Sequence, residues 1–280
     1  MKLTRLLSSL LALTLCFGVF ASAATPPPLP LNGPQSIAVD ASGNLYVANI
    51  GGNNILKYNP AYVQQTAKTI TKGINDPNGL AIDPYGNLWV ANFLSGNITE
   101  YTAGIQNTSA TISLQNAGAL AFDGIGNLWA QSGGGNLVIY SPTAVYAPPS
   151  HLVRTMTPGG TIQSFTIGAG AFVYGTSTQT FLDSASSTLL GNPLNGGAFG
   201  FGAWALAPDN KGNVYIAGTD DNLYIAHPGG TATVVVALPS TSGVVDLAVD
   251  NARGRVYFSD RFNNRILVYS TKGVLLHTIT

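Results

Sequence analysis

Charged residues are scarce in this sequence. Only 9% of its 280 residues are Asp, Glu, Lys or Arg, and 12 basic residues balance 12 acidic ones, whereas a typical globular chain has about 25% charged residues. Because no basic excess is available to neutralise phosphates, we expect no nucleic-acid partner. The hydrophobic fraction of 45% is enough to form a core, which excludes disorder for most of the chain.

Cysteine is almost absent. The single cysteine, Cys16, lies in an N-terminal segment with a charged start, an apolar run over residues 6–20 and the small residues Ala21-Ser22-Ala23. This pattern predicts a cleaved signal peptide over residues 1–23, and the apolar run is too short for a membrane anchor. The mature chain would then have no disulfide and no thiol chemistry. We therefore expect a secreted or periplasmic bacterial protein with no membrane span.

Glutamate and histidine are also rare, which limits the possible chemistry. Glu100 is the sole glutamate, and the three histidines fall at different places in the repeats described below: His151, His227 and His277. A zinc site needs several convergent ligands, so this distribution makes one improbable. No serine lies in a Gly-x-Ser-x-Gly elbow, so a hydrolase triad is unsupported as well. We expect no cofactor.

A β-hairpin recurs along the chain. In its clearest copy, the strand Leu80-Ala81-Ile82 leads into the turn Asp83-Pro84-Tyr85-Gly86-Asn87, and Leu88 to Asn92 alternate as a second strand. Asp accepts bonds from backbone N–H groups at the start of such a turn, and Gly supplies a left-handed residue. The same pattern returns at four other turns, which begin at Asp40, Asp123, Asp209 and Asp250.

The spacing of the hairpins indicates a propeller. The turn glycines fall at 43, 86, 126, 212 and 254, and the long gap has room for a degenerate copy around residues 165–175. Six copies of about 40–45 residues each predict an all-β, six-bladed β-propeller with four antiparallel strands per blade. We place it at residues 34–280, with the fourth strand of the first blade near residues 67–70.

The residues before the propeller, 24–33, form a Pro-rich arm that we expect to lie outside the core. The last blade has four strands of its own within residues 245–279. We therefore predict that this blade uses only C-terminal residues and shares no sheet with the first blade.

The hairpins and the segment Asn263-Asn264-Arg265-Ile266-Leu267-Val268-Tyr269 resemble the NHL-repeat family of six-bladed propellers. The resemblance covers residues 34–280 and implies the fold, but unrelated activities occur on this scaffold. A second, more distant similarity is to the gluconolactonase-like propellers. It rests on Pro77-Asn78-Gly79-Leu80-Ala81-Ile82-Asp83, and it implies a divalent cation held in the channel mouth by Glu, Asn and Asp side chains.

Only Asn78 matches that ligand set. Glu100 is expected on a third strand away from the channel, and Asp246 is shifted by one residue, so it should face the other way. A hard cation needs several convergent oxygens. A divergent metal-dependent lactonase, with a possible divalent cation, is therefore the alternative function.

The binding face follows from the repeats. The turn aspartates recur in every clear hairpin, so we expect them to cap the turns, without a catalytic role. At the opposite face the copies diverge, and loops on a rigid scaffold usually carry function. Five positions before the turn Asp stand Gln35, Asn78 and Trp204; after the second strand come Asn49, Asn92, Gln131 and Asp260. These seven residues are our ligand-binding candidates.

Two of these predictions leave alternatives open. The asparagines could instead cap loops with their side chains. Trp204 could serve as an aromatic platform for a sugar or an apolar group, or it could fill space beside the Gly-rich residues 196–202. We predict a monomeric, non-catalytic binding scaffold for a protein, a peptide or a cell-envelope glycan, with no catalytic residue.

Overall fold

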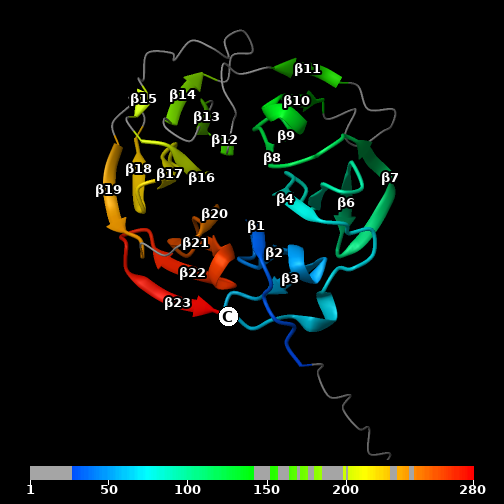
Figure 1. Ribbon diagram of the computed structural model, residues 1–280, viewed down its shortest axis with the longest axis horizontal. Coiled ribbons are helices and arrows are strands. Elements are labelled where there is room, and N and C mark those ends of the chain that lie inside the picture. The colour runs from blue at the N-terminus through cyan, green and yellow to red at the C-terminus, as the bar shows by residue number, and fades with distance from the viewer. Residues whose placement is uncertain are drawn as a thin grey trace, which may run out of the picture.

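The computed structural model describes residues 27–141, 152–156, 164–168, 171–175, 180–184, 198–199, 201–227, 232–239 and 243–280. Its sheets stand side by side in a ring around a central axis, so the predicted all-β propeller is confirmed (Figure 1). The predicted signal peptide lies outside the described residues. Within the described ranges, no helix is long and apolar enough to cross a membrane.

The strands form one three-stranded sheet and five four-stranded sheets, each built from strands that are consecutive in sequence. The first three sheets comprise β1 (Pro34–Val39), β2 (Leu45–Asn49), β3 (Asn54–Tyr58); β4 (Pro77–Ile82), β5 (Leu88–Asn92), β6 (Asn97–Thr102), β7 (Ile105–Ser113); and β8 (Leu120–Phe122), β9 (Leu128–Gln131), β10 (Leu137–Tyr140), β11 (Leu152–Met156).

The other three sheets lie in the second half of the chain. They comprise β12 (Ser164–Gly168), β13 (Ala171–Gly175), β14 (Thr180–Ser184), β15 (Ala198–Phe199); β16 (Ala203–Pro208), β17 (Val214–Gly218), β18 (Asn222–Ala226), β19 (Ala232–Ala237); and β20 (Val244–Asp250), β21 (Arg255–Asp260), β22 (Arg265–Ser270), β23 (Leu275–Ile279). The degenerate copy expected around residues 165–175 is therefore present as the hairpin β12–β13.

The first sheet departs from the prediction of four strands per blade. Residues 67–70 form no fourth strand: a short 3₁₀ helix, η2, occupies Thr66–Lys68, and two isolated bridges, Ile55 to Ile70 and Tyr58 to Gln64, extend the sheet. The described residues thus give five four-stranded sheets where six were predicted. Strand period is a weak signal in so short and polar a segment, because turn hydrogen bonds compete with the sheet there.

The hydrophobic core lies between neighbouring sheets. One cluster joins the sheets of β5 and β9 through Trp89 and Leu128, and another joins the sheets of β17 and β21 through Tyr215 and Phe258. The described core thus lies between neighbouring sheets, as expected for sheets packed around a ring.

The turn aspartates have the predicted structural role. Asp83 Oδ1 accepts hydrogen bonds from the backbone N–H groups of Tyr85 and Asn87, and Oδ2 accepts bonds from the Asn87 amide and Trp89 Nε1. The turn glycines are left-handed, with φ of 87° at Gly86. Asp123 repeats all four bonds in the next sheet.

The ring closes without a shared sheet, as predicted, because β20 to β23 all come from the C-terminal repeat. Asn264 has a left-handed backbone, and its side-chain oxygen accepts a hydrogen bond from Gly33 N at 2.7 Å. Asn53 makes the same type of contact with Asp76 N at 2.8 Å, between the first and second sheets. The junction between the last and the first sheet therefore uses the same type of hydrogen bond as the junction between the first and second sheets.

The prediction that the arm lies outside the core is wrong for its last part. Leu31 is 5% exposed and packs in the cluster that contains Leu56 of the first sheet and Ile266 and Ile279 of the last. A Pro-rich composition favours an extended backbone, but it does not prevent one apolar side chain from filling the seam between two sheets.

Candidate functional site

The inner strands of the six sheets enclose a central channel. Residues from β1, β4, β8, β12, β16 and β20 line a cavity of about 380 Å³. In the five clear repeats the inner strand begins at one face of the ring and runs toward its Asp-Gly turn, so these strand starts gather at the face opposite the turns. The lining is mainly aliphatic, with Phe122 and Phe165 as its aromatic members.

A β-bulge recurs near the start of these inner strands. The register of β1 against β2 shifts between Pro34 and Ser36, and the same shift occurs at the start of β4, β16 and β20. The extra residue in each bulge is Gln35, Asn78, Trp204 or Val245. A bulge places an additional side chain at the end of a strand and breaks the strict alternation of faces.

This bulge overturns the expectation that Asp246 faces away from the channel. Asp246 follows the bulged Val245, and both residues line the cavity. Strict alternation would have sent them to opposite faces, and the sequence contains no glycine or proline at this point that would have indicated a bulge.

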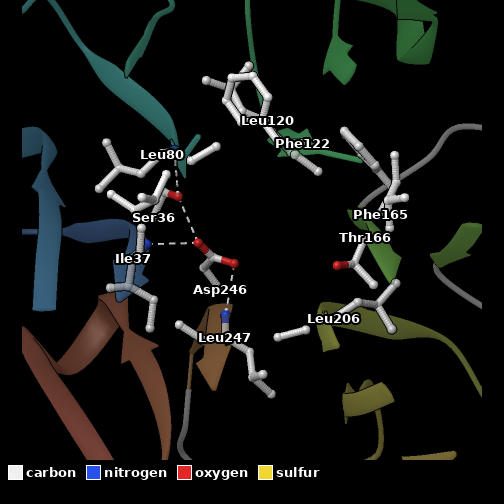
Figure 2. Close-up of a pocket in the computed structure, with 18 of the residues that line it drawn as sticks. Ser36, Ile37, Leu80, Leu120, Phe122, Phe165, Thr166, Leu206, Asp246 and Leu247 are labelled. Carbon is white, nitrogen blue, oxygen red and sulfur yellow. Dashed lines mark hydrogen bonds between the residues drawn. The ribbon is translucent and has the colours of Figure 1, made fainter. Parts of the chain in front are cut away.

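Hydrogen bonds fix the Asp246 carboxylate between the last and first inner strands. Its Oδ2 accepts bonds from Ser36 Oγ at 2.7 Å and Ile37 N at 2.8 Å, and its Oδ1 accepts one from Leu247 N at 2.8 Å (Figure 2). Ser36 Oγ in turn accepts a bond from Leu80 N at 3.0 Å. Burial raises the pKa of Asp246 to about 6 against the lowering effect of these bonds, and no positive charge contributes to the shift.

The channel brings together three of the seven predicted ligand-binding residues. Gln35, Asn78 and Gln131 all line the cavity, and they come from three successive sheets. Arg261 donates a hydrogen bond through Nη1 to Gln35 Oε1 at 2.7 Å. Trp204 does not line the cavity; it is 42% exposed at its bulge position, so it is a surface residue and does not act as a buried filler.

The other three predicted residues are buried within their own sheets. Asn49, Asn92 and Asp260 are at most 1% exposed, and each accepts a hydrogen bond from the backbone N–H group 17 residues earlier, in the segment before the inner strand. Asp260 Oδ2 also accepts a bond from Arg265 Nε at 2.6 Å. The structure thus shows the loop-capping contacts, and a role of these residues in binding stays a prediction.

Glu100, His227 and His277, which were considered for metal chemistry, lie apart from the channel. Glu100 on β6 is 3% exposed, accepts a bond from Asn107 Nδ2 at 2.6 Å, and has a pKa raised by burial. His277 stacks on Tyr62, and His227 lies 2.9 Å from Asn213 Oδ1 through Nδ1; His151 lies outside the described residues. In the described part of the chain, no three His, Cys, Asp or Glu side chains converge in a way that could hold a metal ion.

Comparison with known proteins supports the fold and goes no further. No protein-family model matches the chain, and no curated protein matches it. Similar solved structures include virginiamycin B lyase from Staphylococcus aureus, with a TM-score of 0.61 and 14% identity over 89% of this chain and 86% of that chain.

Two other propellers are equally similar. A streptogramin B lyase has a TM-score of 0.63 and 12% identity over 91% of this chain and 85% of that chain. Hydrazine synthase from Kuenenia stuttgartiensis has a TM-score of 0.63 and 12% identity over 92% and 89%. At such identities the likeness shows a shared β-propeller and nothing about activity.

Proposed function

We propose that this protein is an exported, monomeric, non-catalytic binding propeller of the six-bladed NHL type. In this proposal the three-stranded sheet counts as the first blade. The ligand, a protein, a peptide or a cell-envelope glycan, docks at the face opposite the Asp-Gly turns and contacts the channel mouth.

One observation carries the proposal. Gln35, Asn78 and Gln131 come from different sheets, and all three line one channel. Amide side chains offer both donors and acceptors, which suits the hydroxyl groups of a glycan and the backbone of a peptide. A concavity in which a few polar groups converge is the usual form of a binding site in proteins. Trp204, exposed at the equivalent position of β16, adds an aromatic surface on which a sugar ring can stack.

The test is capture of a partner from the native cell envelope, followed by a glycan array and a peptide array. We expect Gln35→Ala, Asn78→Ala and Trp204→Ala to weaken the captured interaction while the melting temperature stays close to that of the unaltered protein. Tyr85→Ala and Ile125→Ala are matched controls, because both side chains are exposed on turns at the other face. If only the two control variants lost binding, the ligand would lie at the face of the turns, and the proposal would be wrong.

A second candidate, a divergent metal-dependent lactonase, gains one supporting observation. Asp246 and Asn78 both line the channel, whereas the sequence predicted that Asp246 would face away. The donor set nevertheless fits a hard cation poorly. Asp246 is the only carboxylate in the described lining, and three of its acceptor positions already take hydrogen bonds. A stoichiometric divalent ion in the purified protein, together with lactone hydrolysis, would favour this enzyme over a binding scaffold.

A further inference from the structure

The channel contains an isolated negative charge. Among the described residues that line it, Asp246 is the only ionisable one. The charged groups on the elements around it have other partners: Arg261 on η4 (Arg261–Asn263) donates to Gln35 of the channel lining, Asp260 pairs with Arg265, and Asp250 pairs with Arg253. None of these charges contributes to the pKa shift of Asp246. An ionised carboxylate in apolar surroundings is disfavoured unless a cation compensates it.

The carboxylate has acceptor capacity left on its channel side. A carboxylate offers about four acceptor positions, and the described residues occupy three: two on Oδ2, from β1, and one on Oδ1, from Leu247 N. Figure 2 shows Oδ2 directed at Ser36 and Ile37, while Oδ1 lies toward the open centre of the cavity. A donor entering the channel would therefore meet Oδ1.

The opposite side of the cavity is mainly apolar, and it carries one hydroxyl group, that of Thr166, which faces the open centre (Figure 2). Leu120, Phe122, Phe165 and Leu206 lie across the open centre from Asp246 (Figure 2). The cavity of about 380 Å³ lies in the range of pockets that hold small molecules, for which apolar walls contribute affinity and a few polar groups fix orientation. A neutral sugar would leave the charge of Asp246 uncompensated, and an anion would be repelled by it.

We propose that the channel binds a small organic ammonium ion, with its protonated amine on Asp246 Oδ1 and its apolar body against Leu120, Phe122, Phe165 and Leu206. The inference rests on the proposed function in that it uses the same channel, and it names a ligand chemistry for it. A charge-assisted N–H···O bond in a site with few competing donors is the strongest contact available there. Ligands without a positive charge can contact the same apolar side chains but form no such bond.

The experiment is calorimetric titration of the purified protein with 2-phenylethylammonium, 2-phenylethanol and 3-phenylpropanoate. At about pH 7.5, above the usual pKa of a carboxyl group, we expect the ammonium ion to bind about tenfold or more tightly than the alcohol, and the phenylpropanoate not to bind. Asp246→Asn should remove this preference, because it removes the charge and keeps the side-chain size. Asp221→Asn, a carboxylate outside the channel at a left-handed position that suits Asn, should leave the preference unchanged.

The unaltered protein provides a second measurement, which holds even if Asp246→Asn fails to fold. Protonation of Asp246 competes with the ammonium ion, so affinity should fall by up to about tenfold for each pH unit below the pKa of the free site. Equal affinity for the amine and the alcohol, no binding of the amine at millimolar concentration, or a flat profile between about pH 4.5 and 7.5 would overturn the inference. If an envelope partner binds the protein but the channel shows no preference for the amine, the proposed function stands and this inference fails. If the amine binds but no envelope partner is found, this inference stands and the proposed function fails.

Discussion

Substitution of Asp260 separates a structural role from a binding role. Its carboxylate is fully buried and accepts hydrogen bonds from Gly243 N, from Asn263 Nδ2 and from Arg265 Nε. In Asp260→Ala these donors lose their partner, and the guanidinium of Arg265, which is 27% exposed, keeps a charge beside an apolar methyl group. Removing one member of a buried charged pair costs about 3–5 kcal/mol. We therefore expect a loss of about 3 kcal/mol, at the lower end because water reaches Arg265.

The assay is equilibrium unfolding in urea at about pH 7. Arg265→Ala and the double variant complete a thermodynamic cycle, which isolates the coupling between the two side chains. Asn92→Ala is a matched comparison, since it removes the equivalent neutral cap, and it should cost about 1–3 kcal/mol. If Asp260→Ala lost ligand binding but unfolded at the same urea concentration as the unaltered protein, the loop-capping interpretation would be refuted.

Other predictions follow from single contacts. Gly86→Val should cost about 1–3 kcal/mol in thermal unfolding, because φ is 87° and no neighbouring atom lies within 4 Å of an added Cβ, so backbone strain acts alone. Leu31→Ala should destabilise by about 2–4 kcal/mol as a core truncation, whereas Leu29→Ala, on a 40% exposed side chain, should cost under about 1 kcal/mol. The pKa of Asp246 is raised to about 6 in the folded state, so the folded protein holds this proton more tightly than the unfolded chain. Stability should therefore fall as pH rises from about 4 to 6, by at most ~3 kcal/mol, an amount that screening by water in the channel reduces. Asp246→Asn should flatten this part of the stability profile, which is measured by pH-dependent melting.

The repeated hairpin could be predicted because each copy carries its own local signals. Asp83 and Gly86 define the turn, and Leu88 to Asn92 define the strand, without any knowledge of the rest of the chain. The same signals placed Glu100 away from the channel and assigned the turn aspartates to capping. Because these local preferences agree across the copies, the fold class could be predicted from the sequence.

The channel lining was less predictable because it depends on bulges. The bulge at Val245 contains no glycine or proline, so alternation sent Asp246 to the wrong face. The burial of Leu31 was missed for a related reason. It depends on packing between the first and last sheets, which overrides local propensity.

The contact between Asn264 and Gly33 has a consequence for how the chain could be rearranged. Asn53 and Asp76 make an equivalent hydrogen bond between the first two sheets. We therefore expect that the chain could be cut between these two sheets and joined between the last and the first. A circular permutant, opened between Ile70 and Asp76 and joined by a short linker from Thr280 to Pro27, would keep every strand pairing and move only the free ends. Such a permutant should fold to the same ring, and the original seam would become an internal connection.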